Sequence, residues 1–137
     1  MKRNLIAPEN ALEHDLFFGP QVAGTQISPP WQKSPRTYRT QTGIIAWMDG
    51  DLYNREQIVK QRNWTEQSDI ELLVSLITRP DTKSALTALD GLFSLVLLDT
   101  HRHQLHILTD RYGLRPLFFH TGPSGISWSS EAKSFLG

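Results

Sequence analysis

Apolar residues recur at helical spacing in the middle of the chain. Ser68 and Glu71 stand at the spacing of a capping box, which predicts the start of a helix there. Pro80 predicts its end. The apolar residues between these signals follow the spacing i, i+3, i+4 and i+7 of one helix face: Ile70, Leu73, Val74 and Ile77.

Apolar runs bounded by turn signals predict strands on both sides of this helix. Residues 43–48 form the first run, and the Asp49-Gly50 pair after it indicates a turn. Residues 91–98 are almost continuously apolar, as in a strand buried on both faces. Further strands are expected at 104–109, 117–120 and 126–129. The expected core residues are Leu92, Phe93, Leu95, Val96, Leu97, Ile107, Leu117 and Phe118.

Three shorter helices complete the expected order. One covers residues 55–61 with Asn54 as its cap, and one covers about 82–89. The last begins at Ser129 or Ser130. The order of a strand, helices and then an antiparallel meander predicts one α+β domain over all 137 residues.

Residues 25–42 have a different composition from the rest of the chain. They hold three prolines and three basic residues but no acidic residue, which predicts an irregular loop. Trp31 and Tyr38 among these cations could stack on nucleic-acid bases. The chain has 14 basic and 14 acidic side chains and no basic face elsewhere, which favours a solvated loop without a nucleic-acid partner.

The composition excludes several kinds of chemistry. No cysteine is present, which excludes disulfides and any cysteine nucleophile within these residues. No apolar run reaches the length of about 20 residues that spans a membrane, so we expect a cytoplasmic protein without a membrane partner. The histidines of the segment 101–106 have no carboxylate neighbours to complete a metal site, and we expect none.

The segment DRYGLRPLFF, residues 110–119, combines turn and strand signals. Gly113 permits a positive φ, and Pro116 fixes the backbone where the next strand begins. Asp110 or Arg111 is able to hydrogen-bond the turn backbone. We therefore interpret this segment as an architectural link between two strands.

Several segments, in order, resemble the glutaminase half of asparagine synthetases. They are WMDGDLYNREQIV, SDIELLVSLI, ALTALDGLFSLVLLDTHRHQLHILTDRYGLRPLFF and WSSEAKSFLG. The resemblance covers residues 43–137 and implies a class II glutamine amidotransferase domain of the Ntn type. Such a domain is an αββα sandwich of two antiparallel sheets flanked by helices.

The resemblance also implies a site, but the residues that perform its chemistry are changed. Family members carry a cysteine nucleophile after the initiator methionine, where this chain has Lys2. Asp49 and Gly50 occupy the oxyanion-hole positions, where the family has an asparagine and a glycine. Asp51 replaces a glutamate, and Asp69 matches an aspartate that holds the amino-acid end of the substrate. The resemblance therefore implies a relict pocket without catalytic residues.

The arginine that binds the substrate carboxylate in the family has no clear counterpart. Arg36 and Arg39 are the candidates, but their segment does not align. Comparable losses occur in β-lactam synthetases and in lasso-peptide macrolactam synthetases, where the glutaminase-like half remains as a scaffold. In those enzymes ATP and Mg²⁺ bind a synthetase domain with an SGGxDS loop, which this chain lacks.

Three functions remain open from the sequence. The first is a non-catalytic scaffold or docking domain, whose partner is a synthetase-like domain or a second copy of the chain. The second is an amino-acid sensor that uses Asp69, and the third is a hydrolase that uses Thr25 after cleavage of the Gly24–Thr25 bond. Either an interface or the core would account for the four tryptophans: Trp31, Trp47, Trp64 and Trp128.

Overall fold

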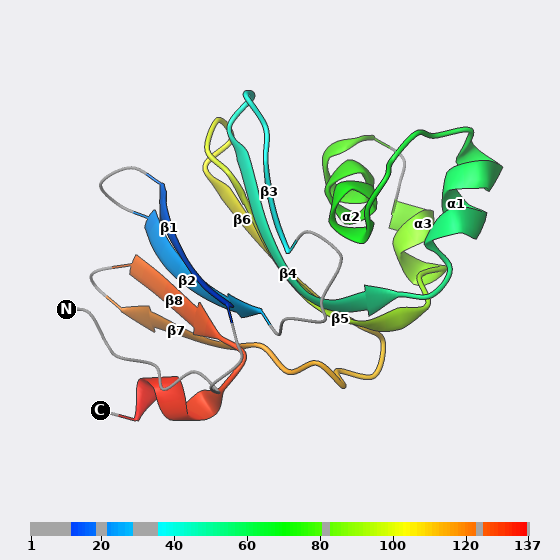
Figure 1. Cartoon of the computed structure of the whole chain (residues 1–137). Helices are drawn as coiled ribbons and strands as arrows, with labels where there is room; N and C mark the ends of the chain where they lie inside the picture. The colour runs from blue at the N-terminus through cyan, green and yellow to red at the C-terminus, as the bar shows by residue number, and fades with distance from the viewer. Residues whose placement is uncertain (1–11, 19–21, 29–35, 81–82, 123–124, 137) are drawn as a thin grey trace. The chain divides into compact units, whose positions relative to one another are not determined.

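The chain divides into two compact units, residues 1–34 and residues 35–137 (Figure 1). A computed structural model describes residues 12–18, 22–28, 36–80, 83–122 and 125–136. The first unit contains an antiparallel pair of strands, β1 (Leu12–Phe18) and β2 (Val22–Ser28). The prediction of a single domain over the whole chain stays a prediction.

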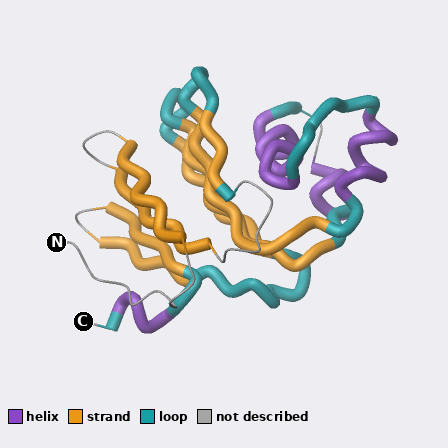
Figure 2. The backbone as a smooth tube through the Cα atoms, viewed as in Figure 1, coloured by secondary structure: helices purple, strands orange, loops and turns teal. Residues whose placement is uncertain are grey.

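The second unit is built on a four-stranded antiparallel sheet with the order β3-β4-β5-β6. Its strands are β3 (Thr37–Arg39), β4 (Ile44–Leu52), β5 (Gly91–Asp99) and β6 (Gln104–Thr109). Three helices connect β4 to β5 (Figure 2): α1 (Arg55–Arg62), α2 (Asp69–Thr78) and α3 (Lys83–Thr87). The predicted α+β class with antiparallel sheets is confirmed.

The main core lies between α2 and one face of this sheet. Met48 of β4 is paired with Leu95 of β5, and both are buried in one cluster with the apolar residues of α2. Trp47 alternates to the opposite sheet face, as the twofold repeat of a strand requires. Four side chains of α2 are at most 1% exposed: Ile70, Leu72, Leu73 and Leu76. The apolar face of α2 is thus wider than its sequence pattern predicts, and Ile77 is only partly buried.

The capping predictions had different outcomes. The capping box of Ser68 and Glu71 is confirmed, with the Glu71 N–H donating to Ser68 Oγ at 3.3 Å. The prediction that Asn54 caps α1 through its side chain is wrong. Asn54 instead donates to the carbonyl of Ala88 at 2.7 Å and accepts from the N–H of Asp90 at 3.0 Å. Its side chain therefore joins the start of α1 to the segment before β5.

The turn expected at Asp49-Gly50 is wrong, because β4 continues through both residues to Leu52. Gly50 keeps its place opposite Phe93 of β5 with a φ of +94°. A Cβ atom at Gly50 would stand 1.9 Å from the carbonyl oxygen of Leu92. Glycine is required here by close approach of two strands, a role that its turn propensity concealed.

The core prediction holds for the centre of β5 and fails outside it. Phe93, Leu95, Val96 and Leu97 are buried as expected. Three expected core residues are only half-buried because they lie at a strand end, on an edge strand or before a hairpin: Leu92, Ile107 and Leu117. Phe118 is 39% exposed. It belongs to β7, which pairs only with β8 among the described strands, so its expected core position is wrong.

The end of the chain forms a hairpin and a short 3₁₀ helix. The hairpin strands are β7 (Phe118–Gly122) and β8 (Gly125–Ser129). The helix expected to begin at Ser129 or Ser130 begins later, as a 3₁₀ helix over Ala132–Phe135. Before it, Ser129 Oγ accepts from the N–H of Glu131 in a local turn. The ring of Trp128 in β8 lies 5.2 Å from that of Trp47 in β4.

The irregular loop predicted for 25–42 overlaps two strands. Residues 25–28 belong to β2, and residues 37–39 belong to β3. The loop prediction is therefore wrong at these residues, because pairing of β2 with β1 and of β3 with β4 overrides the proline-rich and basic composition. Arg36 is 8% exposed, so it contributes no cation to a nucleic-acid surface.

The segment after β6 is an architectural turn, as predicted. Asp110 is 4% exposed, and its carboxylate accepts from three backbone N–H groups at 2.9–3.2 Å: those of Tyr112, Leu114 and Arg115. Gly113 adopts a φ of +63° within this turn. Arg111 donates to the carbonyl of Thr87 at 2.6 Å and so attaches the turn to the end of α3.

We expect Asp110→Asn to remove part of the dependence of stability on pH. Burial raises the pKa of the Asp110 carboxyl group, but the backbone donors outweigh burial and hold the pKa below its usual value. A lowered pKa stabilises the fold above the unfolded-state pKa of about 4, and this contribution is lost as the pH falls through the folded-state value. Urea unfolding at pH 7 and pH 3 measures the effect. The wild type should have a higher free energy of unfolding than the variant at pH 7, and this difference should be smaller at pH 3. A difference that is equal at both pH values contradicts the account.

Candidate functional site

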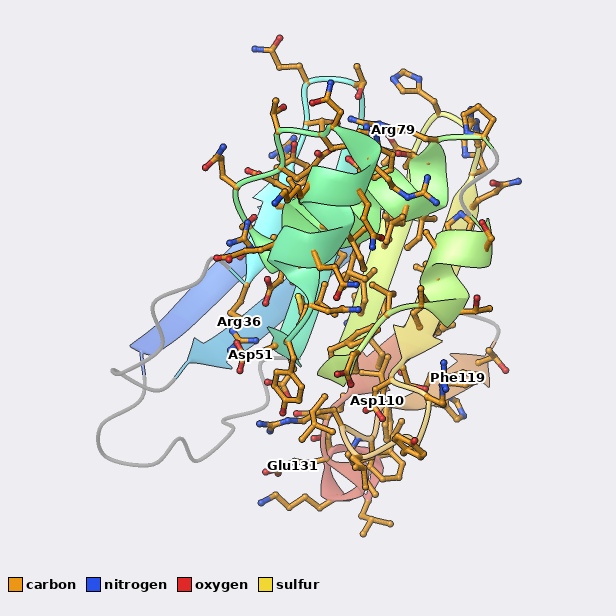
Figure 3. The ribbon with its side chains drawn as sticks, turned by 90° about the vertical axis from the view of Figure 1, so that its right-hand side faces the viewer. Arg36, Asp51, Arg79, Asp110, Phe119 and Glu131 are labelled. Atoms are coloured by element: carbon orange, nitrogen blue, oxygen red, sulfur yellow. The ribbon has the colours of Figure 1, made fainter. Side chains whose placement is uncertain are left out.

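Asp49, Gly50 and Asp51 are consecutive residues near the end of β4. The buried side chain of Arg36 contacts Gly50 and Asp51, and Figure 3 shows Arg36 beside Asp51. One Arg36 Nη atom donates to the carbonyl oxygen of Gly50. The other lies 3.3 Å from Asp51 Oδ1. The Asp51 side chain is 58% exposed and that of Arg36 only 8%, so the ion pair has one solvated and one buried partner.

Asp49 has a different cationic partner. Its Oδ2 atom lies 3.7 Å from Nη1 of Arg115, which follows the Asp110 turn. Both side chains are about half exposed, at 47% and 48%. Solvent screening makes such a pair weak. The Asp49 carboxylate offers only hydrogen-bond acceptors, whereas the resemblance predicts an oxyanion donor at this residue.

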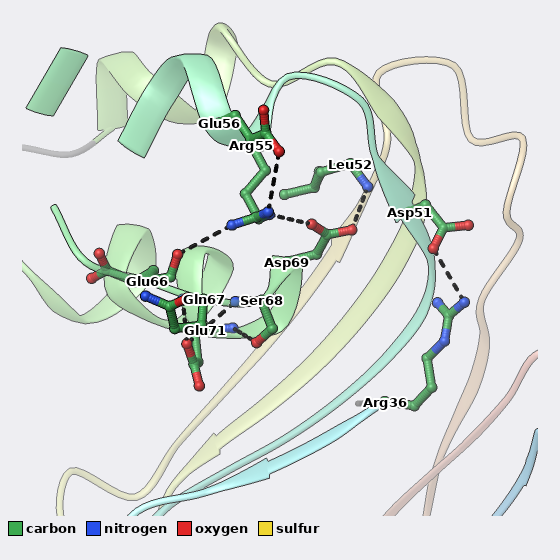
Figure 4. Close-up of polar contacts among 10 residues, drawn as sticks. All are labelled: Arg36, Asp51, Leu52, Arg55, Glu56, Glu66, Gln67, Ser68, Asp69 and Glu71. Atoms are coloured by element: carbon green, nitrogen blue, oxygen red, sulfur yellow. Dashed lines mark hydrogen bonds and ion pairs between the residues drawn. The ribbon is translucent and has the colours of Figure 1, made fainter. Parts of the chain in front are cut away.

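Asp69 is held on the opposite side of the β4 end (Figure 4). Its Oδ2 atom accepts from the backbone N–H of Leu52 at 2.9 Å, and its Oδ1 atom lies 3.3 Å from Nε of Arg55. Asp69 is the first residue of α2, so these contacts attach the helix to the end of β4 and to α1. Both of its carboxylate oxygens therefore have partners within the chain.

The three aspartates expected in the relict pocket thus meet three different arginines. Figure 4 shows Asp51 directed to Arg36 and Asp69 directed to Arg55, on separate sides of the strand. Sequence analysis named the acids but assigned no partners to them. Arg55 and Arg115 gave no sequence signal, because the pairings span 14 and 66 residues and depend on the way the strands are placed.

The buried carboxylate of Glu66 is held by partners within the chain, so it has a structural role. It accepts from Ser75 Oγ at 2.7 Å and lies 2.8 Å from Nη2 of Arg79. Burial raises the pKa of Glu66, but these partners and backbone donors lower it below the usual value. The guanidinium groups of Arg79 and Arg62 lie 4.2 Å and 5.2 Å from the ring of Trp64. These contacts connect the segment before α2 to the end of that helix.

The contacts of the aspartates with arginines limit the chemistry that is available at the end of β4. Among the residues the structure describes, no group of three or more His, Asp or Glu side chains is arranged to hold a metal ion. The sequence contains no thiol. The groups gathered at Asp49, Gly50 and Asp51 are two carboxylates and a carbonyl that already accepts from Arg36. They are suited to bind cations, whereas an oxyanion requires donors.

These features define a small α+β domain of antiparallel sheets, consistent with an Ntn-like sandwich, with two carboxylates near the end of β4. The model of the glutamine amidotransferase domain matches residues 27–137, and the chain belongs to this family. Helices long and apolar enough to cross a membrane are absent from the described part of the chain.

Asparagine synthetases are among the similar proteins. The glutamine-hydrolyzing asparagine synthetase of Gallus gallus is 33% identical over 91 residues, which is 64% of this chain and 16% of the relative. That of Rattus norvegicus is 26% identical over 113 residues, or 80% and 20%. Amidase chry2 of Gibberella zeae is 33% identical over 100 residues, or 70% and 15%. The chain spans at most one fifth of these relatives.

Proposed function

We propose that this glutamine amidotransferase domain is non-catalytic and serves as a scaffold or docking domain of an asparagine-synthetase-like, amide- or lactam-forming enzyme. The observation that supports this most directly is the environment of Asp49. Its carboxylate lies 3.7 Å from Nη1 of Arg115, and the resemblance matches Asp49 to the residue that supplies an amide donor in the family. A negative charge there repels a developing oxyanion. Together with the absence of cysteine, this removes both nucleophile and oxyanion stabilisation.

The alternative of an amino-acid sensor receives less support. Binding of a substrate amine by Asp69 would have to break its contacts with the Leu52 N–H and with Arg55. The Asp69 side chain is only 14% exposed. Its hydrogen bond and ion pair are therefore partly shielded from water and are stronger than they would be in solvent. Asp69 is therefore better suited to hold α2 than to hold a ligand.

We expect calorimetric titration with glutamine to give no saturable heat at millimolar concentration. The acids of the relict pocket already have cationic partners within the chain, so little affinity remains for the ammonium group of an amino acid. Asp69→Asn serves as a control that weakens the internal contacts. A saturable signal from the wild type that disappears in this variant would support the sensor and contradict the scaffold.

The hydrolase alternative has its own measurement. Thr25 pairs with Asp15 inside the β1–β2 hairpin, so cleavage of the Gly24–Thr25 bond would cut a paired strand. We expect the intact mass of the purified chain to remain that of all 137 residues during incubation. A new species lacking the first 24 residues, absent in Thr25→Ala, would instead support self-cleavage.

The docking part of the proposal requires an exposed surface, and the tryptophans do not supply it. Trp47 is 9% exposed, and Trp64 and Trp128 are half-buried, so these three indoles favour the core alternative and present little exposed surface. Trp31 lies outside the described residues. Indole rings pack inward here because each has a large partner, as in the pairing of Trp47 with Trp128.

Other large apolar side chains are exposed instead. Tyr112 is 75% exposed, Leu114 62% and Phe119 58%. The first two project from the turn that Asp110 holds, so they are presented on ordered backbone. Exposed apolar side chains that gather on one segment mark contact surfaces. We assign this surface to a synthetase-like domain or chain, with a second copy of this chain as the alternative.

ATP and Mg²⁺ belong, in this proposal, to that synthetase-like partner. The residues present do not fit either group, since the sequence lacks an SGGxDS loop and the described residues provide no metal-binding cluster. A lactam-forming enzyme needs no ammonia, because an amine within its own substrate attacks the activated carboxylate. A partner of the β-lactam or lasso-peptide macrolactam synthetase kind would therefore be compatible with a non-catalytic domain. We also propose a cytoplasmic location for the complex.

A further inference from the structure

The side chain of Arg36 enters the acidic end of β4 as a ligand would. Its guanidinium group is hydrogen-bonded to the Gly50 carbonyl and ion-paired with Asp51, residues that lie 14 and 15 positions away in the sequence. The side chain is only 8% exposed. In Figures 3 and 4 the guanidinium points toward Asp51 at the end of the strand. A cation is therefore already present where the relict pocket has its acceptors.

The backbone of Arg36 is also fixed in place. Its carbonyl accepts from the N–H of Met48 at 2.8 Å, just before β3 begins at Thr37. The guanidinium Nε atom is buried and has no hydrogen-bond partner among the described residues. Burial of an N–H group without a partner costs free energy. The contacts of the two Nη atoms must offset this cost. These contacts stabilise the buried position of the charge.

We propose that Arg36 is a tethered guanidinium that fills a cation site formed by the Gly50 carbonyl and the Asp51 carboxylate, and so closes this site to small amine ligands. This inference rests on the proposed function for the location of the relict pocket. A group held on the same chain has an effective concentration of the order of millimolar or higher. A free amine or guanidinium that binds with ordinary millimolar affinity therefore does not displace it.

The proposal predicts chemical rescue by methylguanidinium. Arg36→Ala should lower the thermal unfolding midpoint by about 5–10 °C, because it leaves the site without its cation. Methylguanidinium chloride at 1–20 mM should then raise the midpoint of this variant in a saturable way, whereas equal concentrations of sodium chloride should not. The wild type, whose site is filled, should show no such rise.

Two control variants assign the effect to this site. Arg36→Ala combined with Asp51→Asn removes the carboxylate and should abolish rescue. Arg115→Ala removes a half-exposed arginine from another aspartate and should show no rescue, because no buried site is vacated. Rescue that is equal in all variants, or absent from Arg36→Ala, overturns the proposal.

A second measurement remains decisive if Arg36→Ala does not fold. In the wild type, NMR should show slow solvent exchange for the guanidinium hydrogens of Arg36, and Asp51→Asn should speed this exchange at least tenfold. Fast exchange in the wild type overturns the proposal. Glutamine hydrolysis by Arg36→Ala or the wild type would instead contradict the proposed non-catalytic function, so the two ideas fail separately.

Discussion

Replacing Gly50 with alanine is expected to destabilise the protein by about 3–5 kcal/mol. An added Cβ atom would stand 1.9 Å from the Leu92 carbonyl oxygen and 2.7 Å from Cα of Phe93, both of them backbone atoms. The φ of +94° adds strain for any L side chain. Relief would require β4 and β5 to separate where Gly50 is paired with Phe93. Urea unfolding followed by circular dichroism measures the loss.

Gly113→Ala is the matched control for this prediction. Gly113 also has a positive φ, +63°, but a Cβ atom there meets nothing within 4 Å. The variant should lose only about 1–2 kcal/mol, the cost of a left-handed conformation for alanine. Equal losses in both variants would show that conformation alone matters at Gly50, and would contradict the close strand approach.

Leu72→Ala is expected to cost about 2–5 kcal/mol, and more than Ile77→Ala on the same helix. Leu72 is 0% exposed and lies in the core cluster with β4 and β5, so truncation leaves a cavity. Ile77 is only partly buried at the rim of that cluster, and its loss should be about 1–2 kcal/mol. The sequence pattern gives the reverse order, because it places Ile77 and not Leu72 on the apolar face. Chemical unfolding of both variants decides between the pattern and the structure.

The sequence predicted α2 well because its signals are local. The capping box of Ser68 and Glu71 involves residues three positions apart, and the buried Ile70 and Leu73 follow one helical repeat. The width of the buried face depends on how deeply the helix packs against the sheet. That depth is a tertiary property, and the i, i+3, i+4, i+7 pattern of Ile70 does not include Leu72 or Leu76.

The course of β4 could not be predicted for a related reason. Asp49-Gly50 is a strong turn signal by composition, yet the strand continues because β5 supplies a partner for each residue up to Leu52. Asn54 likewise resembles a helix cap, but the Ala88 carbonyl and Asp90 N–H engage its amide instead. In both places a contact made across more than 30 residues overrides a local preference.

The grouping of the candidate site residues into one relict pocket stays a prediction. The resemblance named Asp49, Asp51 and Asp69, of which the first two lie in β4 and the third begins α2 and binds the N–H of Leu52. It did not predict that each has an arginine partner, because arginines far apart in the chain show no pattern that links them to these acids. The pairings of Arg36 and Arg55 give Asp51 and Asp69 cationic partners within the chain, which is compatible with the proposed scaffold.

A glutamine hydrolysis assay on the purified chain tests the non-catalytic assignment most directly. Glutamate and ammonia are measured with time over a range of protein concentrations, beside Asp49→Asn and a sample without protein. We expect the rate to equal that of the sample without protein for both chains, because no thiol is present and a single amide donor does not replace it. Hydrolysis that rises in proportion to the concentration of the unmodified protein would contradict this account.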